Sequence, residues 1–384
     1  MHAVSRVLAL KPLNIVLPAR QLAAIKKNSM AKNEGDDQSI EHQLARTPSA
    51  SAAASDTSLT MISMFSGCGG MDLGFVGGFD YGGTSYSRLP VNLLGAYDND
   101  RKSKRTYDKN FDHELELLDL TNADVGALPA SDILIGGFPC QEFSSCGPRG
   151  GIDTHRGQLF RTMFRYASKH KPAVVVAENV DHLRFIHGGA DLKTIRRSLA
   201  RAGYKVHLWP VYAPDFGVPQ TRRRIFIVGV RNDLPATLKP PVGTFAADHR
   251  STSWAIEDLA KITDEAVANQ SQYFKAGLAQ KGHGQGDEVN NKHLPAYTIR
   301  ANSRSRVQFH YELPRRLTVR ECARIQTFPD NFIFPDEATP SIKQIGNAVP
   351  PVLAHAIASH VIKYLTALPK TKIKIREGHG KAEA

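Results

Sequence analysis

The chain has 384 residues, of which 41% are hydrophobic and 22% charged, values typical of a globular protein with a sizeable core. No apolar run approaches the roughly 18 residues of a membrane-spanning helix, so the sequence predicts no membrane span. Lys and Arg number 49 against 37 acidic residues, a formal charge of +12 that is compatible with a polyanionic partner without identifying one. The four cysteines are too few and too scattered for a disulfide framework or a zinc site, which indicates a reducing compartment. They are Cys68, Cys140, Cys146 and Cys322.

The first 58 residues differ in composition from the rest of the chain. Residues 1–33 are basic and contain no acidic residue, and residues 47–58 form the low-complexity run TPSASAAASDTS. We interpret residues 1–58 as a disordered leader, or as translation assigned upstream of the true start, with Met30 as the alternative start. An organelle transit peptide is the other interpretation.

From Leu59 onward, short aliphatic or β-branched runs alternate with longer amphipathic stretches. The expected strands are Thr60–Phe65, Leu93–Tyr97, Asp132–Ile135, Ala173–Ala177, Val206–Val211 and Ile225–Val230. The expected helices between them include Leu159–Lys169 and Leu192–Ala202. This alternation predicts an α/β domain over residues 59–231, with a doubly wound, mostly parallel sheet covered on both faces. Ligands of such sheets bind at the carboxyl ends of the strands.

The alternation ends near Arg231. Residues 232–315 show no clear βα pattern and carry the basic run RANSRSR at Arg300–Arg306, so they form a second, smaller and irregular region. A helix is expected to begin after Thr318, which stands at capping-box spacing from Glu321. We assign residues 316–365 to closing helices that return to the first domain, and residues 366–384 to a basic tail.

A glycine-rich turn follows the first expected strand. Phe65–Gly70 reads FSGCGG, and a helix is expected to open directly after it. Glycines at this place let the backbone approach a nucleotide or nucleoside closely, although such turns also occur without a ligand. The spacing is not G-x-G-x-x-G and no lysine follows as in a P-loop, which disfavours dinucleotides and nucleoside triphosphates.

Two acidic residues lie at the carboxyl ends of later apolar segments. Asp98 is placed to accept hydrogen bonds from ribose hydroxyls, or else it caps a helix or is simply a solvated acid. Asp119 is a further strand-end acid that can receive an adenine amino group, with Leu120 against the ring.

Three other loops carry reactive side chains. Gly136–Ser144 reads GGFPCQEFS and places Cys140 on a stiffened loop, either as a nucleophile or as a small buried hydrophobe. Glu178 ends the fifth run, where a carboxyl group can act as an acid. Residues 220–224, just before the last expected strand, have the sequence QTRRR. Their arginines either bind a ligand or form a solvated face.

Taken in chain order, these segments resemble the DNA cytosine-5 methyltransferases of the prokaryotic restriction-modification type, from about Leu59 to about Leu365. The matching segments are Phe65–Gly70, Asp98, Asp119, Gly137–Ser144, residues 178–180 (ENV), residues 220–224 (Gln-x-Arg-x-Arg), Arg316–Pro329 and Gln344–Pro350. The resemblance implies the fold of the S-adenosylmethionine-dependent methyltransferases, with residues 232–315 as the target-recognition region.

The resemblance also implies roles for individual residues. Cys140 is the expected nucleophile at carbon 6 of cytosine, and Glu178 is the acid toward ring nitrogen 3. Arg224 supports the carbonyl of the base and the nucleophile, while Arg222 contacts the same region or phosphate. S-adenosyl-L-methionine is the implied cofactor, and no metal is expected. The implied cofactor-binding residues are Phe65, Ser66, Gly67, Gly69, Gly70, Leu73, Asp98, Asp119, Leu120, Pro139, Asn347 and Val349.

Double-stranded DNA is the implied substrate, with the target cytosine flipped out of the stack. Gln141 and Ser144 are placed to follow the target strand or fill the gap. Arg300, Arg304 and Arg306 suit phosphates or guanine edges, unless residues 232–315 are an ordinary insertion with solvated charges. We expect a cytoplasmic, nucleoid-associated monomer that binds no membrane, with a cognate restriction endonuclease acting separately.

Three other interpretations of the sequence remain. An RNA cytosine-5 methyltransferase shares the chemistry, and the sizeable recognition region favours DNA over it. A Rossmann-type oxidoreductase predicts a G-x-G-x-x-G turn, which Phe65–Gly70 does not supply. An inactive DNA-binding relative is disfavoured because Cys140, Glu178 and both motif arginines are present.

Overall fold

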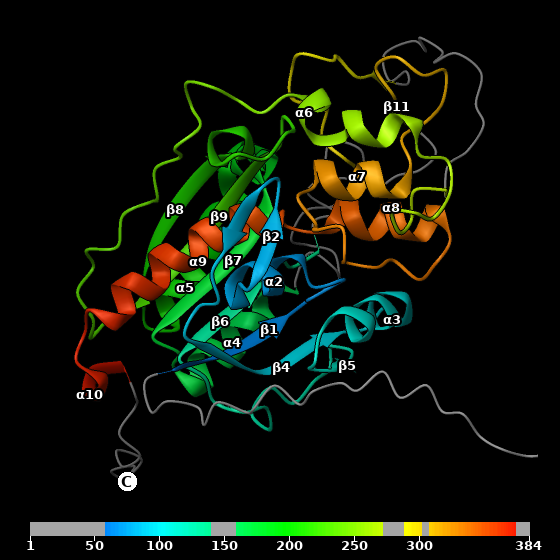
Figure 1. Ribbon diagram of the computed structural model, residues 1–384. Coiled ribbons are helices and arrows are strands. Elements are labelled where there is room, and N and C mark those ends of the chain that lie inside the picture. The colour runs from blue at the N-terminus through cyan, green and yellow to red at the C-terminus, as the bar shows by residue number, and fades with distance from the viewer. Residues whose placement is uncertain (1–57, 140–158, 272–287, 302–306, 374–384) are drawn as a thin grey trace, which may run out of the picture. The chain divides into compact units, whose positions relative to one another are not determined.

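A seven-stranded sheet forms the centre of the computed structural model, which describes residues 58–139, 159–271, 288–301 and 307–373 (Figure 1). The strands lie in the order β5-β4-β1-β6-β7-β9-β8. Their bounds are β1 Leu59–Met64, β4 Val91–Asp98, β5 Leu115–Leu117, β6 Ile133–Gly136, β7 Val174–Val180, β8 Tyr204–Tyr212 and β9 Arg223–Arg231. Each of the six expected strands is present within a few residues of its expected bounds, so the α/β prediction is confirmed.

The sheet is parallel except at one strand. The pairs β5–β4, β4–β1, β1–β6 and β6–β7 are parallel, whereas β9 is antiparallel to both β7 and β8. Because β9 is reversed, its first residues lie at the same edge as the carboxyl ends of the parallel strands. Arg224 pairs with Val180 there, so the reversal places an arginine at the edge where ligands bind.

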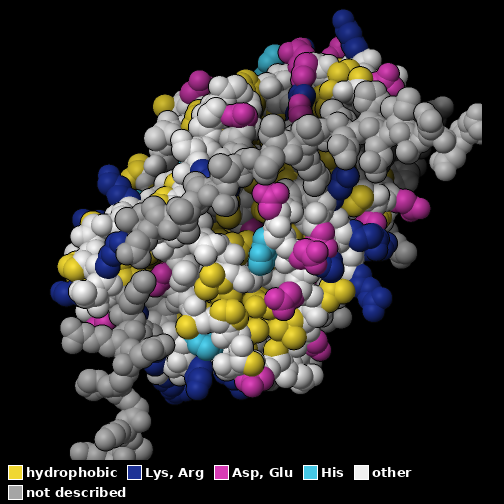
Figure 2. Space-filling view, turned by 60° about the horizontal axis from the view of Figure 1, so that its bottom comes forward, with side chains coloured by type: hydrophobic (Ala, Val, Ile, Leu, Met, Phe, Trp, Pro, Cys, Tyr) yellow, Lys and Arg dark blue, Asp and Glu magenta, His cyan; other side chains and the backbone are white. Residues whose placement is uncertain are grey.

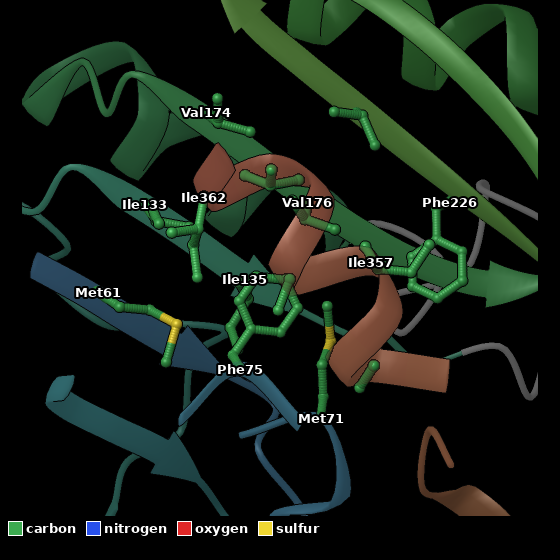
Figure 3. Close-up of a cluster of buried hydrophobic side chains, with 14 of the residues drawn as sticks. Met61, Met71, Phe75, Ile133, Ile135, Val174, Val176, Phe226, Ile357 and Ile362 are labelled. Carbon is green, nitrogen blue, oxygen red and sulfur yellow. The ribbon is translucent and has the colours of Figure 1, made fainter. Parts of the chain in front are cut away.

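One face of the sheet packs against helices from opposite ends of the described chain. Helix α2 (Gly70–Val76) and helix α9 (Pro351–Thr366) contact each other on this face (Figure 1). Side chains of alternate strand residues, such as Met61 and Val176, point into the layer with Ile357 and Ile362 of α9 (Figure 3). Fully burying one such aliphatic side chain contributes about 1.5–3 kcal/mol, so α9 is part of the domain core.

The opposite face is covered by helices α4 (Phe160–His170) and α5 (Ala190–Arg201). The intervening strand residues point this way, among them Ile62 and Val175, and they pack with Phe164 and Leu199. Both faces are therefore buried, which explains why the strands read as continuous apolar runs. Helix α3 (Arg101–Asn110) packs Tyr107 against the edge formed by β4 and β5.

A third apolar cluster joins the irregular region to the closing helices. It contains Ile256, Ile299, Cys322 and Phe328. The elements here are α6 Thr252–Ile256, the 3-10 helix η5 Glu257–Lys261, β10 Glu288–Val289, β11 Gln308–Phe309, α7 Val319–Ile325 and α8 Ala338–Asn347. The expected capping box of α7 is confirmed, since the Thr318 hydroxyl accepts from the Glu321 N–H and the Glu321 carboxylate accepts from the Thr318 N–H.

Shorter elements complete the described chain. They are β2 Phe79–Tyr81, β3 Thr84–Tyr86, α10 Lys370–Ile373, and the 3-10 helices η2 Asp181–Arg184, η3 Ile186–Gly189 and η4 Ala213–Phe216. The hairpin β2–β3 was not expected from the sequence. Helix α10 lies in the segment expected to be a basic tail, and its Lys372 and Ile373 carbonyls accept hydrogen bonds from Arg231.

Among the described residues, one stretch is long and apolar enough to cross a membrane by length and composition. It is Ala338–Thr366, with a mean hydropathy of 1.3 over its most apolar window. The stretch consists of α8 and α9, and 67% of that window is buried inside the protein. The apolar side chains of α9 face the sheet, which accounts for the composition of this helix.

The excess of basic residues does not form one continuous surface on the face shown in Figure 2. Among the described side chains there, Lys and Arg lie mainly toward the periphery, and Asp and Glu lie both near the middle and among them at the edges. A basic composition alone therefore does not locate a nucleic-acid surface on this protein.

Candidate active site

The glycine-rich loop after β1 has a backbone that few residue types adopt. Phe65, Gly67 and Gly69 all have positive φ, at 57°, 56° and 88°. Gly69 immediately precedes α2, and a Cβ at this position would lie 2.4 Å from the Phe111 ring. Glycine is therefore required at position 69 both by conformation and by packing.

Asp98, at the end of β4, holds this loop in place. Its Oδ2 accepts a hydrogen bond from the Gly67 N–H at 2.9 Å, and its Oδ1 accepts from the Asp100 N–H at 2.9 Å. Burial raises the pKa of this carboxyl group above its ordinary value, and the hydrogen bonds oppose that shift. The helix-cap interpretation of Asp98 is wrong, because Asp100 caps α3 (Arg101–Asn110) and accepts from the Lys102 N–H at 2.8 Å. Asp98 instead organises the turn and faces a cavity, a position compatible with the ribose interpretation.

The cavity has a volume of about 770 Å³ and lies at the carboxyl edge of the sheet. This volume is within the usual range for small-molecule sites. Ten residues that the sequence singled out line it: Phe65, Ser66, Gly67, Gly70, Asp98, Pro139, Glu178, Arg224, Asn347 and Val349. They come from the beginning, the middle and the end of the described chain, so the fold gathers these distant motifs around one space.

Glu178 and Arg224 form an ion pair in the wall of this cavity. The distance from Arg224 Nε to Glu178 Oε1 is 2.7 Å, and both side chains are largely buried, at 13% and 9% exposure for Arg224 and Glu178. Because Val180 pairs with Arg224, Glu178 lies diagonally across the two strands on the same face. A Cβ at Gly137 would lie 3.3 Å from Glu178 Oε2, so this glycine leaves room for the carboxylate.

Asn179 connects this pair to the loop that follows β6. Its side-chain amide donates to the Phe138 carbonyl at 3.1 Å, and its carbonyl oxygen accepts from the Val180 N–H at 2.9 Å. Phe138 itself is buried against Phe160. The chain is thus fixed up to Pro139, the residue before Cys140.

Arg222 does not lie in the cavity wall. Its guanidinium group is buried and donates to the carbonyls of Ile299, Gly346 and Ala348, at 3.2, 3.0 and 2.9 Å. The expectation of a contact with the base or with phosphate is therefore corrected, because these hydrogen bonds direct the side chain toward the protein interior. Arg222 instead holds the segment before α9 against β9.

Four residues of the implied cofactor set do not line the cavity. Gly69 and Leu73 pack in the protein interior around α2. Leu120 is buried in the core beneath α4, and its carbonyl accepts from Thr162. Asp119 is exposed, and its carboxylate accepts from the Thr121 N–H at 3.0 Å. The structure therefore does not bring the residues expected around adenine into the cavity.

Several predicted residues lie outside the described part of the chain. They are Cys140, Gln141, Ser144, Arg304 and Arg306. Arg300 is described, and its Nη2 lies 3.7 Å from Glu288 Oε1 with 29% of the side chain exposed. Its neighbour Ala301 lines the cavity, so residues 232–315 reach the site at this point.

Sequence reasoning missed other lining residues, including Arg101, Lys102, Thr339 and Lys343. The run RKSKR at Arg101–Arg105, which begins three residues after Asp98, was a usable signal, because residues that closely follow a strand-end acid lie at the same edge. Among the described residues, no group of three or more His, Cys, Asp or Glu side chains is arranged to hold a metal ion.

The fold agrees with that of the S-adenosylmethionine-dependent methyltransferases. The shared features are a mostly parallel sheet with one reversed strand, a glycine-rich loop after β1 and an acidic residue at the end of β4. A family model described as C-5 cytosine-specific DNA methylase matches residues 59–363. The chain belongs to this family, and it is a DNA cytosine-5 methyltransferase.

Related proteins agree with this assignment. Type II methyltransferase M1.ScrFI of Lactococcus lactis subsp. cremoris is 34% identical over 81% of this chain and 79% of its own length. Type II methyltransferase M.NlaX of Neisseria lactamica is 32% identical over 82% of this chain and 99% of its own length. The chain thus covers most of the length of each.

Solved structures share the fold at lower identity. The Entamoeba histolytica methyltransferase EhMeth superposes with a TM-score of 0.60 at 17% identity, covering 80% of this chain and 99% of its own. The S. pombe Dnmt2 methyltransferase gives a TM-score of 0.57 at 16% identity, covering 79% and 98%. At these low sequence identities, the similarity shows a shared fold alone.

Proposed function

We propose that this enzyme transfers a methyl group from S-adenosyl-L-methionine to carbon 5 of a cytosine flipped out of a specific double-stranded DNA sequence. A covalent bond between Cys140 and carbon 6 activates the base. The observation that carries this proposal is the shared cavity, which is lined by the Asp98-held loop on one side and by the Glu178–Arg224 pair on another. A cofactor and a base held in one cavity are placed for direct transfer.

The residues on the loop side suit S-adenosylmethionine, which supplies an electrophilic methyl group when bound. The raised pKa of Asp98 indicates a carboxylate poorly compensated by the protein alone, so hydroxyl donors such as those of a ribose would stabilise it. Ser66, Gly67 and Gly70 offer close backbone approach, and Asn347 and Val349 complete the wall.

The Cys140 thiolate adds to carbon 6, which makes carbon 5 nucleophilic enough to take the methyl group. The addition builds negative charge toward ring nitrogen 3. Glu178 provides a proton or hydrogen bond there, while Arg224 orients that carboxyl group and faces the carbonyl oxygen of the base. A base then removes the carbon 5 proton, and the Cys140–C6 bond breaks with return of its electrons to sulfur.

Residues 232–315 read the DNA sequence. Gln141 and Ser144 contact the target strand, and Arg300, Arg304 and Arg306 supply cations for phosphates or guanine edges. Because the similar proteins are named Type II methyltransferases, we further propose a restriction-modification role with a separate cognate endonuclease. The protein would act as a cytoplasmic monomer at the nucleoid.

Duplex DNA with 5-fluorocytosine at the target tests the covalent step, because fluorine at carbon 5 leaves no proton to remove. The wild type should form a complex that resists denaturing electrophoresis, and Cys140→Ser should form none. Cys68→Ser and Cys322→Ser are matched controls, since both thiols are buried and burial raises the pKa of Cys68 to about 12. Cys146→Ser is a third control.

Trapping that persists in Cys140→Ser, or that disappears with Cys146→Ser instead, would refute the assignment of the nucleophile. The same assay on tRNA carrying the modified base separates a DNA substrate from an RNA substrate. Transfer to tRNA without transfer to duplex DNA would overturn the proposed substrate while leaving the chemistry in place.

A further inference from the structure

Asp72 is a buried carboxyl group beneath the glycine-rich loop, in the first turn of α2. The residue has no exposed surface and does not line the cavity. Its Oδ1 accepts a hydrogen bond from Ser63 Oγ at 2.7 Å, and its Oδ2 accepts from the Tyr107 hydroxyl at 2.9 Å. A carboxylate is costly to bury, so its presence here indicates a purpose that an apolar side chain would not serve.

The hydrogen bonds around Asp72 have a fixed direction. A serine hydroxyl has one proton, and Ser63 donates its proton to the carboxylate. Ser63 Oγ can therefore only accept from Ser66, whose Oγ donates to it at 2.8 Å. The Ser66 proton is used in this way, so the Ser66 oxygen can only accept from a group inside the cavity that it lines.

We propose that Asp72 is a positioning residue for the cofactor: through Ser63 it fixes the Ser66 hydroxyl as an acceptor for an N–H or O–H group of S-adenosylmethionine. A protonated carboxyl group or an amide at position 72 that donates to Ser63 would release the proton of Ser63 toward Ser66. Ser66 would then lose Ser63 Oγ as the acceptor of its own proton, which would be shared between the Ser63 carbonyl, 3.3 Å away, and the cavity, where it would oppose the donor of the ligand. The inference rests on the proposed function, because the ligand is the proposed cofactor.

The chain of hydrogen bonds from Ser66 through Ser63 to Asp72, called the relay below, should respond to pH. Burial raises the pKa of Asp72 to about 6, with hydrogen bonds from Ser63 and Tyr107 opposing the shift. The titratable groups that face Asp72 are Tyr107 from α3, Asp98 from β4 and Cys68 from the loop. The ionised carboxylate is the form that sets the relay, so cofactor affinity should fall as the pH drops below about 6.

Calorimetry with S-adenosylhomocysteine between pH 5 and 7 tests the proposal on the full chain without DNA. At pH 7 the wild type should bind about tenfold more tightly than Asp72→Asn, the loss expected for a misdirected hydrogen bond. The wild-type affinity should fall toward pH 5, and Asp72→Asn should lack this fall. Asp98 titrates in both proteins and repels the charge of Asp72, so a variant that keeps both carboxyl groups is needed to assign the fall to Asp72.

Tyr107→Phe provides a second test that a purely structural role would not pass. Removing this donor destabilises the carboxylate and raises the pKa of Asp72, so the fall in affinity should begin at a higher pH. Thr106→Val is the matched control, because Thr106 is a buried neighbour on the same helix whose hydroxyl is not in the relay. Its profile should follow the wild type.

A folded Asp72→Asn protein with the affinity and pH profile of the wild type would overturn the proposal. If that variant does not fold, an unshifted profile in Tyr107→Phe overturns it instead. A wild type that binds no S-adenosylhomocysteine would overturn the proposed function as well. Equal affinity of the wild type and Asp72→Asn for S-adenosylhomocysteine would overturn only the role proposed for Asp72.

Discussion

At the residue scale, the Glu178–Arg224 pair links the stability of the site to its chemistry. Each charge is largely buried, and each is the other's closest opposite charge across the two strands, 2.7 Å apart. Removing one partner of a buried pair leaves an uncompensated charge. A glutamine at position 178 keeps an oxygen that accepts from Arg224, so it removes the acid with the smallest change to the packing of the site.

Glu178→Gln should lower the rate of methyl transfer by about 10²–10⁴-fold, the usual contribution of a positioned acid or base. The affinity for S-adenosylhomocysteine should stay close to that of the wild type, because the amide retains the shape of the side chain. Single-turnover transfer to duplex DNA and calorimetry measure the two quantities. Glu116→Gln, an exposed position on β5, is the control. A transfer rate within about twofold of wild type would remove Glu178 from the chemistry.

Sequence reasoning placed several side chains correctly at the cavity and misplaced others for a physical reason. The pattern QTRRR shows three consecutive arginines but not which of them points inward. Arg224 reaches the cavity because β9 is reversed. Arg222 points into the protein interior because its guanidinium group donates hydrogen bonds to three backbone carbonyls there. Strand direction and carbonyl placement are tertiary properties that residue spacing does not encode.

At the element scale, the close approach of α2 and α9 assembles the large domain from segments far apart in sequence. A Cβ at Gly74 would lie 2.3 Å from Ala354 Cβ and 2.7 Å from the Pro351 carbonyl oxygen. The two helices thus touch through backbone and small side chains. Since α2 begins at the glycine-rich loop and α9 begins just after Val349, this contact also sets the two walls of the cavity.

Gly74→Ala should destabilise the protein by about 1–3 kcal/mol through overpacking. The neighbouring atoms belong partly to the backbone, which cannot move aside without shifting α9. Urea denaturation followed by circular dichroism measures the loss. Lys363→Ala, on the exposed side of α9, should change the free energy of unfolding by less than about 0.5 kcal/mol. Equal effects from both variants would contradict the close-packing account.

The elements themselves were largely predictable because their signals are local. Continuous apolar runs marked the strands of a sheet covered on both faces, and Thr318 with Glu321 marked the start of α7. The hairpin β2–β3 was missed although Gly82-Gly83 separates FDY from TSY, a recognised two-residue turn signal. The antiparallel direction of β9 has no such local signal.

At the scale of the whole molecule, the irregular region shares a hydrophobic cluster with the closing helices. Ile256 and Ile299 of residues 232–315 pack with Phe328 and Ile345. Ala296 also exchanges backbone hydrogen bonds with the segment before β9, donating to Pro219 and accepting from Thr221. Residues 232–315 are thus anchored beside the site through Ile256, Ala296 and Ile299.

Exchanging residues 232–315 for the matching segment of a relative with a different DNA target should change the methylated sequence. The exchange should retain the apolar residues at positions 256, 296 and 299, because they anchor the region to the protein. Methyl transfer should then proceed at the new sequence, as measured on duplexes carrying either target. Continued methylation of the original sequence alone would show that the recognition residues lie elsewhere.

We propose above that the enzyme methylates carbon 5 of cytosine at a defined DNA sequence through Cys140. Bisulfite sequencing of plasmid from cells that express the wild type or Cys140→Ser tests this claim most directly. The account predicts protected cytosines at every copy of one short sequence with the wild type, and none above background with the variant. Unprotected cytosines with the wild type, or equal protection with both proteins, would contradict it.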